Sequence, residues 1–327
     1  MNIRLQFHQF GSPKDVLTVE NIELAPLKSH EVRVKMIARP MNPSDLIPIT
    51  GAYAHRIPLP SIPGYEGVGV VEAVGSLVDP LLIGKRVLPL RGEGTWQSFV
   101  TTSHEYVVVV PESIDDFTAA QLYINPLTAF IICTETLQLK SGDTVLVNAC
   151  GSAIGRIFAQ LSKVLGFRLI AIMRNDKHTE ELLKLGATHV INTATSPLQQ
   201  TVLNLTNGRG ADAAIDSIGG VDGNELAYSV RPQGIFLALG LLSGIQVNWA
   251  EIANKAQVNG QVFHLRHWNA EVSAKDWQQT FKTIFTFIES GQLHLMPASA
   301  TFDLIDFKEA IHYLEYARGK VMLTSTS

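Results

Sequence analysis

Apolar and polar residues follow two different periods along the chain, and the change of period divides the chain into parts. Up to about residue 110, short apolar or alternating segments are separated by clusters of proline and glycine. Segments of this kind are typical of strands joined by turns, and they cover residues 32–37, 67–74 and 106–110. We therefore expect a compact, mostly antiparallel, barrel-like domain that contains little helix.

In the middle of the chain, apolar strands alternate with segments whose apolar residues recur at the period of an α-helix. The helical face is clearest over residues 154–165, which end at Gly166, and a second helix over residues 180–185 ends at Gly186. A third helix is expected to begin at Ser196-Pro197, with a cap and a proline in its first turn. Strands are expected over residues 143–148, 168–173, 188–191, 211–216 and 234–239. This alternation predicts a doubly wound parallel sheet.

The last part of the chain returns to mixed structure. Amphipathic helices are expected over residues 275–289 and 306–316, and a last strand over residues 319–323. Asp306 and Glu309 fit a capping box at the start of the second helix. We expect this tail to pack back on the first domain. Residues 1–120 and 264–327 would then form one domain, and residues 121–263 an inserted dinucleotide-binding domain.

Composition and charge exclude several function classes. The net charge of −4 argues against a general nucleic-acid binder, which needs a basic surface. No apolar stretch approaches the roughly 18 residues of a membrane span, and the first residues lack a signal-peptide core, so we expect a cytoplasmic protein without membrane contact. Cys133 and Cys150 are too few for a disulfide framework or a four-cysteine zinc site, and we expect buried thiols.

The turn after the first strand of the middle part has the small residues that a phosphate-binding turn needs. Set against the pattern G-x-G-x-x-G, it has Cys150, Ser152 and Gly155, so that only the last glycine matches. A strand precedes the turn and an amphipathic helix follows it, which is the context that gives the pattern meaning. The alternative is an ordinary tight turn that binds nothing. The expected cofactor contacts in this turn are Gly151, Ser152, Ala153, Ile154 and Gly155.

The end of the second strand of this part decides which dinucleotide is expected. NAD sites usually place a carboxylate there, whereas the 2′-phosphate of NADP needs a cation. The strand ends at Met173, and Arg174 follows directly, with a guanidinium that can grip phosphate. Asp176 comes later and fits better as a helix cap. NADPH is therefore favoured over NADH, the alternative being that Arg174 is a solvated surface residue.

Motifs spread over almost the whole chain resemble those of the medium-chain dehydrogenase/reductase superfamily. They lie at residues 63–75, 84–87, 142–145, 185–188 and 319–321. The resemblance implies an α/β fold in which a GroES-like β-rich barrel domain is joined to an inserted Rossmann domain with a doubly wound parallel sheet.

Zinc-dependent members of that superfamily bind the metal with an early cysteine and a Gly-His-Glu triplet. Here the triplet is Gly64-Tyr65-Glu66, and residues 37–42 contain no cysteine. A catalytic zinc needs about three protein ligands, so the resemblance implies the zinc-free branch and no metal. His264 and His267 lie three positions apart without an evident third ligand, and we expect packing or surface roles for them.

Within the zinc-free branch, the chain resembles the mitochondrial-type 2-enoyl thioester reductases more closely than the quinone oxidoreductases. The matching pieces are Asn-Pro-Ser-Asp at residues 42–45, Gly-Ala-Tyr at 51–53, Gly-Thr-Trp at 94–96, and residues 125–129 and 148–155. The implied reaction is zinc-independent hydride transfer from NADPH to the C=C bond of an α,β-unsaturated carbonyl compound.

The resemblance also implies roles for individual residues. Tyr53 would be catalytic, because a phenol can stabilise the enolate charge or donate a proton to Cα; the alternative is a tyrosine on the barrel surface. Asn42 and Asp45 would orient the site and the nicotinamide ribose. The nicotinamide pocket would include Thr128 and the backbone of Gly240 and Leu241. The substrate pocket would include Phe263 and Trp268, although a packing role for Trp268 is an equal alternative.

Other functions remain open at this point. An NADPH:quinone oxidoreductase would not need Tyr53, and a nucleotide-binding protein without turnover could serve as a structural or sensing module. Residues 54–60 depart from the enoyl reductases, and such loops select substrates, so the acceptor can be an enoyl thioester, an enone or a quinone. The resemblance further implies a homodimer formed through residues 239–250.

Overall fold

The computed structural model describes residues 2–316 and 319–325 and divides into two compact units. The first unit comprises Met1–Ile124, Ser273–Ser290 and Leu295–Ser327, and the second comprises Asn125–Val272 and Gly291–His294. The chain returns to the first unit at Ser273, whereas the sequence places the return at residue 264. The difference arises because helix α10 (Leu265–Glu271) groups with the second unit.

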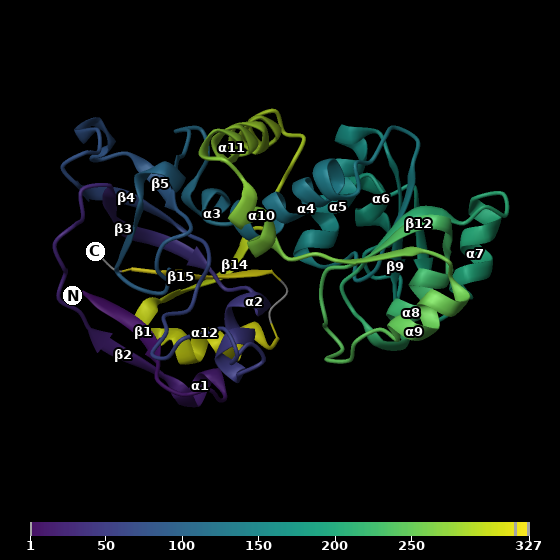
Figure 1. Ribbon diagram of the computed structural model, residues 1–327, viewed down its shortest axis with the longest axis horizontal. Coiled ribbons are helices and arrows are strands. Elements are labelled where there is room, and N and C mark those ends of the chain that lie inside the picture. Colours follow the sequence, from purple (N-terminus) through teal and green to yellow (C-terminus); the bar gives the residue numbers. More distant parts are fainter. Residues whose placement is uncertain (1, 317–318, 326–327) are drawn as a thin grey trace. The chain divides into compact units, whose positions relative to one another are not determined.

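The first unit is built on a mostly antiparallel sheet, as the sequence predicts. In its described part, a seven-stranded sheet has the order β14-β15-β3-β4-β5-β7, with β6 also paired to β3, and β1 pairs with β2 separately. The strands are β1 (Ile3–Phe7), β2 (Leu17–Asn21), β3 (Glu31–Pro40), β4 (Val68–Val74), β5 (Arg86–Pro89), β6 (Phe99–Ser103), β7 (Val107–Val109), β14 (Ala298–Asp303) and β15 (Lys320–Thr324). Strand β15 pairs antiparallel with β3 and parallel with β14. The C-terminal tail therefore completes the first unit (Figure 1).

The second unit contains the predicted doubly wound parallel sheet. Its strands are β8 (Thr144–Val147), β9 (Arg168–Met173), β10 (His189–Asn192), β11 (Ala211–Asp216), β12 (Val230–Ala238) and β13 (Asn259–Val262). Their order is β10-β9-β8-β11-β12-β13. The order reverses between β8 and β11, and ligands of such sheets bind in the crevice at that reversal, beyond the carboxyl ends of the strands. Strand β13 is absent from the sequence prediction, because all its residues are exposed and it has no apolar face.

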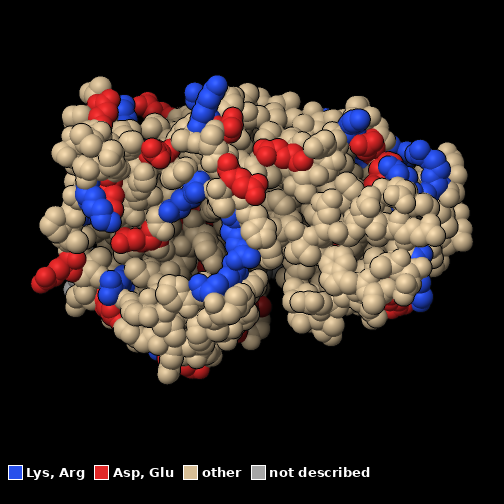
Figure 2. All heavy atoms as spheres, in the orientation of Figure 1, with Lys and Arg blue, Asp and Glu red and all other residues tan. Residues whose placement is uncertain are grey.

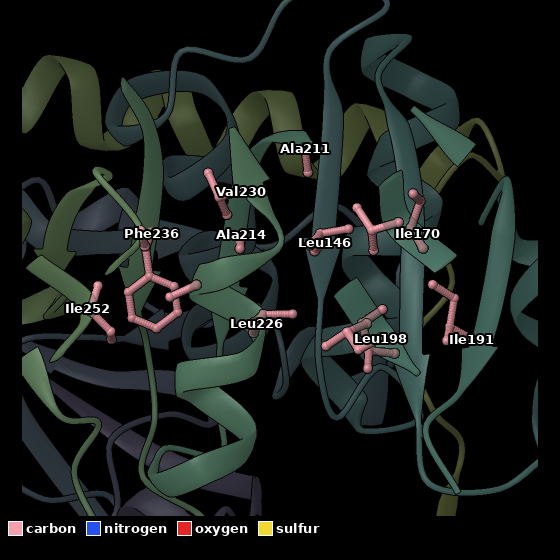
Figure 3. Packing of buried hydrophobic residues seen from close by; sticks show 14 of the residues in the cluster. Leu146, Ile170, Ile191, Leu198, Ala211, Ala214, Leu226, Val230, Phe236 and Ile252 are labelled. Carbon is pink, nitrogen blue, oxygen red and sulfur yellow. The ribbon is translucent and has the colours of Figure 1, made fainter. Parts of the chain in front are cut away.

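One hydrophobic cluster joins this sheet to helices that cover it. The helices are α7 (Leu198–Leu205), α8 (Gly220–Tyr228) and α9 (Trp249–Lys255). Phe236 of β12 is fully buried, and Leu146 of β8 and Ile170 of β9 are buried in the same cluster. Leu226 and Ile252 of the covering helices point into it (Figure 3). These apolar contacts hold the strands of the sheet against the helices that cover it.

Two glycines end helices as the sequence predicts. Helix α5 (Ala153–Leu165) ends at Gly166, whose φ is 80°, and α6 (Thr179–Leu185) ends at Gly186, whose φ is 137°. Residues other than glycine rarely adopt such angles. Of the helices in the described part of the chain, none combines the length and apolar character that a bilayer span requires.

The predicted caps differ from the structure in three places. Asp306 is the N-cap residue of α12 (Phe307–Leu314), as predicted, but its side chain accepts no capping hydrogen bond; the side chain of Asp303 instead caps the preceding 3-10 turn by accepting from the Ile305 N–H (3.0 Å). Helix α7 has Pro197 at its N-cap, so Ser196 lies outside the helix. The Asp176 carboxylate accepts from Asn192 Nδ2 (2.8 Å) instead of capping α6.

Candidate active site

The predicted residues Asn42 and Asp45 lie together at the end of strand β3. Asn42 precedes the short helix α2 (Pro43–Leu46), in which proline takes the first position. The backbone N–H of Asn42 donates to Asp45 Oδ2 (2.7 Å), so the carboxylate closes the start of the helix. Both side chains are buried. The motif is therefore a rigid buried turn.

The side-chain amide of Asn42 bridges two buried charged groups that the sequence prediction did not include. Its Nδ2 donates to Glu66 Oε1 (2.8 Å), and its Oδ1 accepts from Lys320 Nζ. Glu66 and Lys320 are only 1% and 5% exposed, so neither charge is solvated by water. Both residues belong to family motifs, Gly-Tyr-Glu at 64–66 and Gly-Lys-Val at 319–321, so a signal for them was present in the sequence.

The second oxygen of Glu66 holds the backbone at the end of the first unit. Glu66 Oε2 accepts from the N–H groups of Tyr123 (3.0 Å) and Ile124 (2.7 Å). Both carboxylate oxygens thus have donors, as a buried carboxylate requires.

Burial changes the acid–base properties of this network. It raises the pKa of Asp45 to about 7, although the N–H groups of Asn42 and Tyr65 oppose the change. Burial also raises the pKa of Glu66, against the opposing effect of Lys320. The pKa of Lys320 is lowered by burial, and the two carboxylates oppose that shift. One proton can therefore be gained or lost here near neutral pH.

Tyr53 lies beyond α2 in the same unit. After the 3-10 helix η1 (Ile47–Thr50), Gly51 has a φ of 91°, which turns the chain toward Tyr53. The guanidinium carbon of Arg56 lies 4.0 Å from the centre of the Tyr53 ring, within the range of a cation–π contact. The half-buried Tyr53 phenol therefore lies beside a positive charge. That charge would stabilise a negative charge on or near the phenol oxygen.

A second tyrosine, absent from the predicted site, is held by Asp45. The backbone N–H of Tyr65 donates to Asp45 Oδ1 (3.1 Å), while its side chain is 41% exposed between buried neighbours. Burial of part of the ring, and next the Asp45 carboxyl, raise the pKa of the Tyr65 phenol, whereas Arg56 opposes this. Gly64 has a φ of 94°, and a Cβ there would lie 2.3 Å from Trp96 Cδ1. Only glycine fits, so the direction of Tyr65 is set by its backbone.

The predicted phosphate-binding turn fits a phosphate group. Ser152 caps α5, and its Oγ accepts from the Gly155 N–H (3.2 Å). A Cβ on Gly155 would lie 2.4 Å from the carbonyl oxygen of Cys150, so the helix approaches the turn closely only because this residue is glycine. Among the described residues, none accepts a hydrogen bond from the N–H groups of Ala153 and Ile154. Free N–H groups at a helix N-terminus attract anions.

A buried hydrogen-bond network ties together the strand ends at the reversal of the sheet. Asn148 Nδ2, after β8, donates to Asp216 Oδ1 (2.5 Å), and Asn148 Oδ1 accepts from the Ser217 N–H (2.7 Å). Asp216 also accepts from the N–H of Gly219 (3.0 Å) and is fully buried. The sequence prediction does not include Asp216. The one sequence feature that could have indicated Asp216 is its position as a polar residue at the end of an apolar strand.

The other predicted residues all lie in the second unit. Arg174 is exposed directly after β9. Thr128 is buried in α4 (Thr128–Ile131), and Gly240 and Leu241 follow β12. Phe263 is buried after β13.

Trp268 and the two histidines make specific contacts in the second unit. Trp268, in α10, donates from Nε1 to Glu135 Oε2 (2.9 Å), so its indole has a polar partner. The His264 and His267 rings lie edge to face, with centroids 5.3 Å apart. In the described ranges, His, Cys, Asp and Glu do not gather in threes that could hold a metal ion.

Charged side chains of both signs are interspersed on the face drawn in Figure 2. The described residues form no extended basic area on that face. A general nucleic-acid binder needs such an area. The charges on this face thus agree with the net charge of −4.

Comparisons with known proteins identify the relatives of both parts. Residues 28–112 match a family described as the alcohol dehydrogenase GroES-like domain, and residues 153–285 match one described as zinc-binding dehydrogenase. The human mitochondrial enoyl-[acyl-carrier-protein] reductase is 32% identical over 315 residues, covering 94% of this chain and 84% of that protein.

Solved structures resemble the whole chain. A Bacillus thuringiensis protein, provisionally described as an NADPH:quinone reductase, is 65% identical, with a TM-score of 0.98 and coverage of 99% of each chain. The Escherichia coli quinone oxidoreductase, solved in complex with NADPH, is 25% identical, with a TM-score of 0.89 and coverage of 98% of this chain and 99% of that one.

Asp45→Asn is expected to flatten the pH dependence of stability. The folded pKa of Asp45 is raised from 3.8 to about 7, so its contribution is fully present below pH 3.8 and is lost as pH rises through about 7. The free energy of unfolding of the unmodified protein should thus fall by up to about 1.4 kcal/mol per pH unit across this window. Urea unfolding at several pH values measures the slope. The exposed Glu72→Gln on β4 is the control, and equal slopes in Asp45→Asn and unmodified protein would contradict the assignment.

Proposed function

Because the chain belongs to the medium-chain dehydrogenase/reductase superfamily, we propose that it is an NADPH-dependent reductase acting on the C=C bond of an α,β-unsaturated carbonyl compound, such as a 2-enoyl thioester or an enone. The supporting observation is the buried network of Asn42, Asp45, Glu66 and Lys320, from which the segments bearing Tyr53 and Tyr65 extend. The likeness to the human mitochondrial enoyl-[acyl-carrier-protein] reductase, 32% identical over 94% of this chain, also supports the proposal.

The second unit is proposed to bind NADPH, which supplies a hydride when bound. The N–H groups of Ala153 and Ile154, at the N-terminus of α5, suit its pyrophosphate. Arg174, exposed after β9, suits the 2′-phosphate, because a guanidinium pairs with phosphate through two hydrogen bonds. The network of Asn148 and Asp216 keeps the two strand ends in place around the crevice.

Tyr53 is proposed to act on the acceptor. Addition of a hydride at Cβ moves an electron pair onto the carbonyl oxygen, and the enolate then takes a proton at Cα. A phenol O–H can donate a hydrogen bond to that oxygen or deliver the proton, directly or through water. Arg56, stacked on the ring, favours any negative charge that develops on or near the phenol.

A second candidate function is NADPH:quinone oxidoreduction. It is favoured by the likeness to the Bacillus thuringiensis protein, which is 65% identical over 99% of this chain. A quinone accepts a hydride without a protein phenol, so the two candidates differ in their need for Tyr53.

Tyr53→Phe separates the two activities. With NADPH and trans-2-hexenoyl-CoA or a small enone, we expect turnover by the unmodified protein and a loss of about 10²–10⁴-fold in kcat for Tyr53→Phe, the range of general acid–base catalysis. Tyr316→Phe, which alters a strongly exposed tyrosine of the same unit, is the control. An unchanged enoyl rate would remove Tyr53 from the mechanism. Turnover of quinones alone would favour the second candidate, and tight NADPH binding without any turnover would favour a non-catalytic protein.

Arg174→Ala is expected to weaken NADPH binding selectively. Hydrogen bonds to charged groups contribute about 1.5–3 kcal/mol, so Kd for NADPH should rise roughly 10- to 100-fold, while Kd for NADH stays the same. Fluorescence titration with both nucleotides measures this. Arg266→Ala, on α10 of the same unit, is the control. An equal loss for both nucleotides would contradict a 2′-phosphate contact.

A homodimer is proposed through the open edge of the second unit. Strand β13 is exposed along its whole length, although it pairs with β12 on its other side. Large apolar side chains are exposed within residues 241–245, which belong to the segment 239–250 predicted to form the interface, and at Val262 of β13. Unpaired strand edges readily pair with another chain. Two copies joined at β13 would cover this edge and Val262, and the segment 239–250 is proposed to take part in the same interface.

The dimer is tested by size-exclusion chromatography with light scattering at micromolar concentration. We expect the unmodified protein to elute as a dimer and Val262→Lys as a monomer, because a charge at the edge opposes strand pairing. Leu77→Lys, at a residue that is 65% exposed in the first unit, should remain dimeric. A monomeric unmodified protein would refute the interface.

A further inference from the structure

Three ionisable side chains are buried in contact with one network in the first unit. Asp45, Glu66 and Lys320 are 1%, 1% and 5% exposed. An ionised group in such surroundings is stable only when it is paired and hydrogen-bonded. Each carboxylate therefore needs a positive charge or a proton, and the network holds two acids and one base.

Lys320 is the cation that acts on both acids. Among the described residues, it is the one basic side chain whose charge acts on both Asp45 and Glu66. Arg56 acts on the neighbouring Tyr65 phenol, and the charge of the buried Arg39 interacts with that of Asp303. Neither replaces Lys320.

Lys320 also decides how the Asn42 amide is oriented. An ammonium has only donors, so Asn42 must turn its Oδ1 toward Lys320 Nζ, and its Nδ2 then faces Glu66 Oε1 at 2.8 Å. Without the ammonium, Oδ1 of the amide loses this donor, and Glu66 loses the positive charge next to it. Strand β15 brings Lys320 to this place, because the Val321 carbonyl accepts from the Met41 N–H (2.9 Å) directly before Asn42.

The backbone of Asn42 is linked to the segments of both tyrosines. The Asn42 N–H binds Asp45 Oδ2, which starts α2 and leads through η1 to Tyr53. Asp45 Oδ1 in turn accepts from the Tyr65 N–H. The segments of both tyrosines are thus connected through Asp45 to the residue whose side chain Lys320 binds.

We propose that Lys320 is a positioning residue of the acceptor site: its buried ammonium compensates Glu66 and Asp45 and orients Asn42, and thereby fixes the segments that hold Tyr53 and Tyr65. The part of this role that is measured as enoyl turnover rests on the proposed function. Its charge compensation can be measured without any acceptor.

The test compares Lys320→Met, Lys320→Arg and Glu66→Gln with the double variant Lys320→Met/Glu66→Gln. Lys320→Met removes the charge and keeps most of the length. We expect it to lower kcat for the enoyl substrate at least tenfold with Kd for NADPH unchanged. Its stability should also fall more steeply with rising pH than that of the unmodified protein, because carboxyls without a cation hold their protons to higher pH.

Rescue identifies the physical cause. The kcat of the double variant should be at least threefold higher than that of Lys320→Met. Its free energy of unfolding should also fall less steeply with pH, because one uncompensated carboxylate is gone. Lys320→Arg, which keeps the charge, should retain more activity than Lys320→Met. The exposed Lys308→Met on α12 is the matched control.

Several results would overturn the role. They are a double variant no better than Lys320→Met, a pH slope unaffected by Lys320→Met, or a loss of NADPH binding equal to the loss of kcat. If Lys320→Met does not fold, folding of the double variant supports charge compensation, and its failure to fold refutes it. Absence of enoyl turnover in the unmodified protein would refute the proposed function, while the pH slopes would still test the compensation.

Discussion

A lysine ammonium and two carboxylates removed from water together are the constraint on which the first unit depends. Because none of these charges can be left alone in a low-dielectric interior, the segments that carry them must stay in register. Lys320 belongs to β15, Asp45 to α2 and Glu66 to the segment before β4. The C-terminal strand, the early turn and the central sheet therefore come together for electrostatic reasons as well as through their apolar faces.

Each unit uses a buried asparagine at the place where its strands end. In the first unit Asn42 joins an ammonium to a carboxylate, and in the second Asn148 joins a carboxylate to a backbone N–H. A neutral amide suits both places, because it offers a donor and an acceptor in fixed directions without adding a charge. Polar groups are thus held rigidly next to the sites proposed for the acceptor and the nucleotide.

Periodicity predicted most of the fold, because the strands and helices in question bury one face or both. Strand β13 escaped prediction because its edge position leaves every residue exposed. The turn with Ser152 and Gly155 could be predicted from local pattern, whereas the partnership of Asn42 with Lys320 could not. Nearly the whole chain separates those two residues in sequence, and periodicity carries no information on which distant side chains meet. The missing capping bond at Asp306 has a local cause, since this residue also ends a 3-10 turn whose own cap is Asp303.

The Glu66 carboxylate accepts hydrogen bonds from the N–H groups of Tyr123 and Ile124. Those are the last residues of the first unit before the polypeptide crosses into the second at Asn125. The origin of the insertion is therefore anchored by a side chain of the acceptor region. A chimera that joins this nucleotide-binding unit to another β-rich domain therefore needs an equivalent carboxylate at the junction. Without it, the backbone N–H groups where the inserted unit starts would lack these hydrogen bonds.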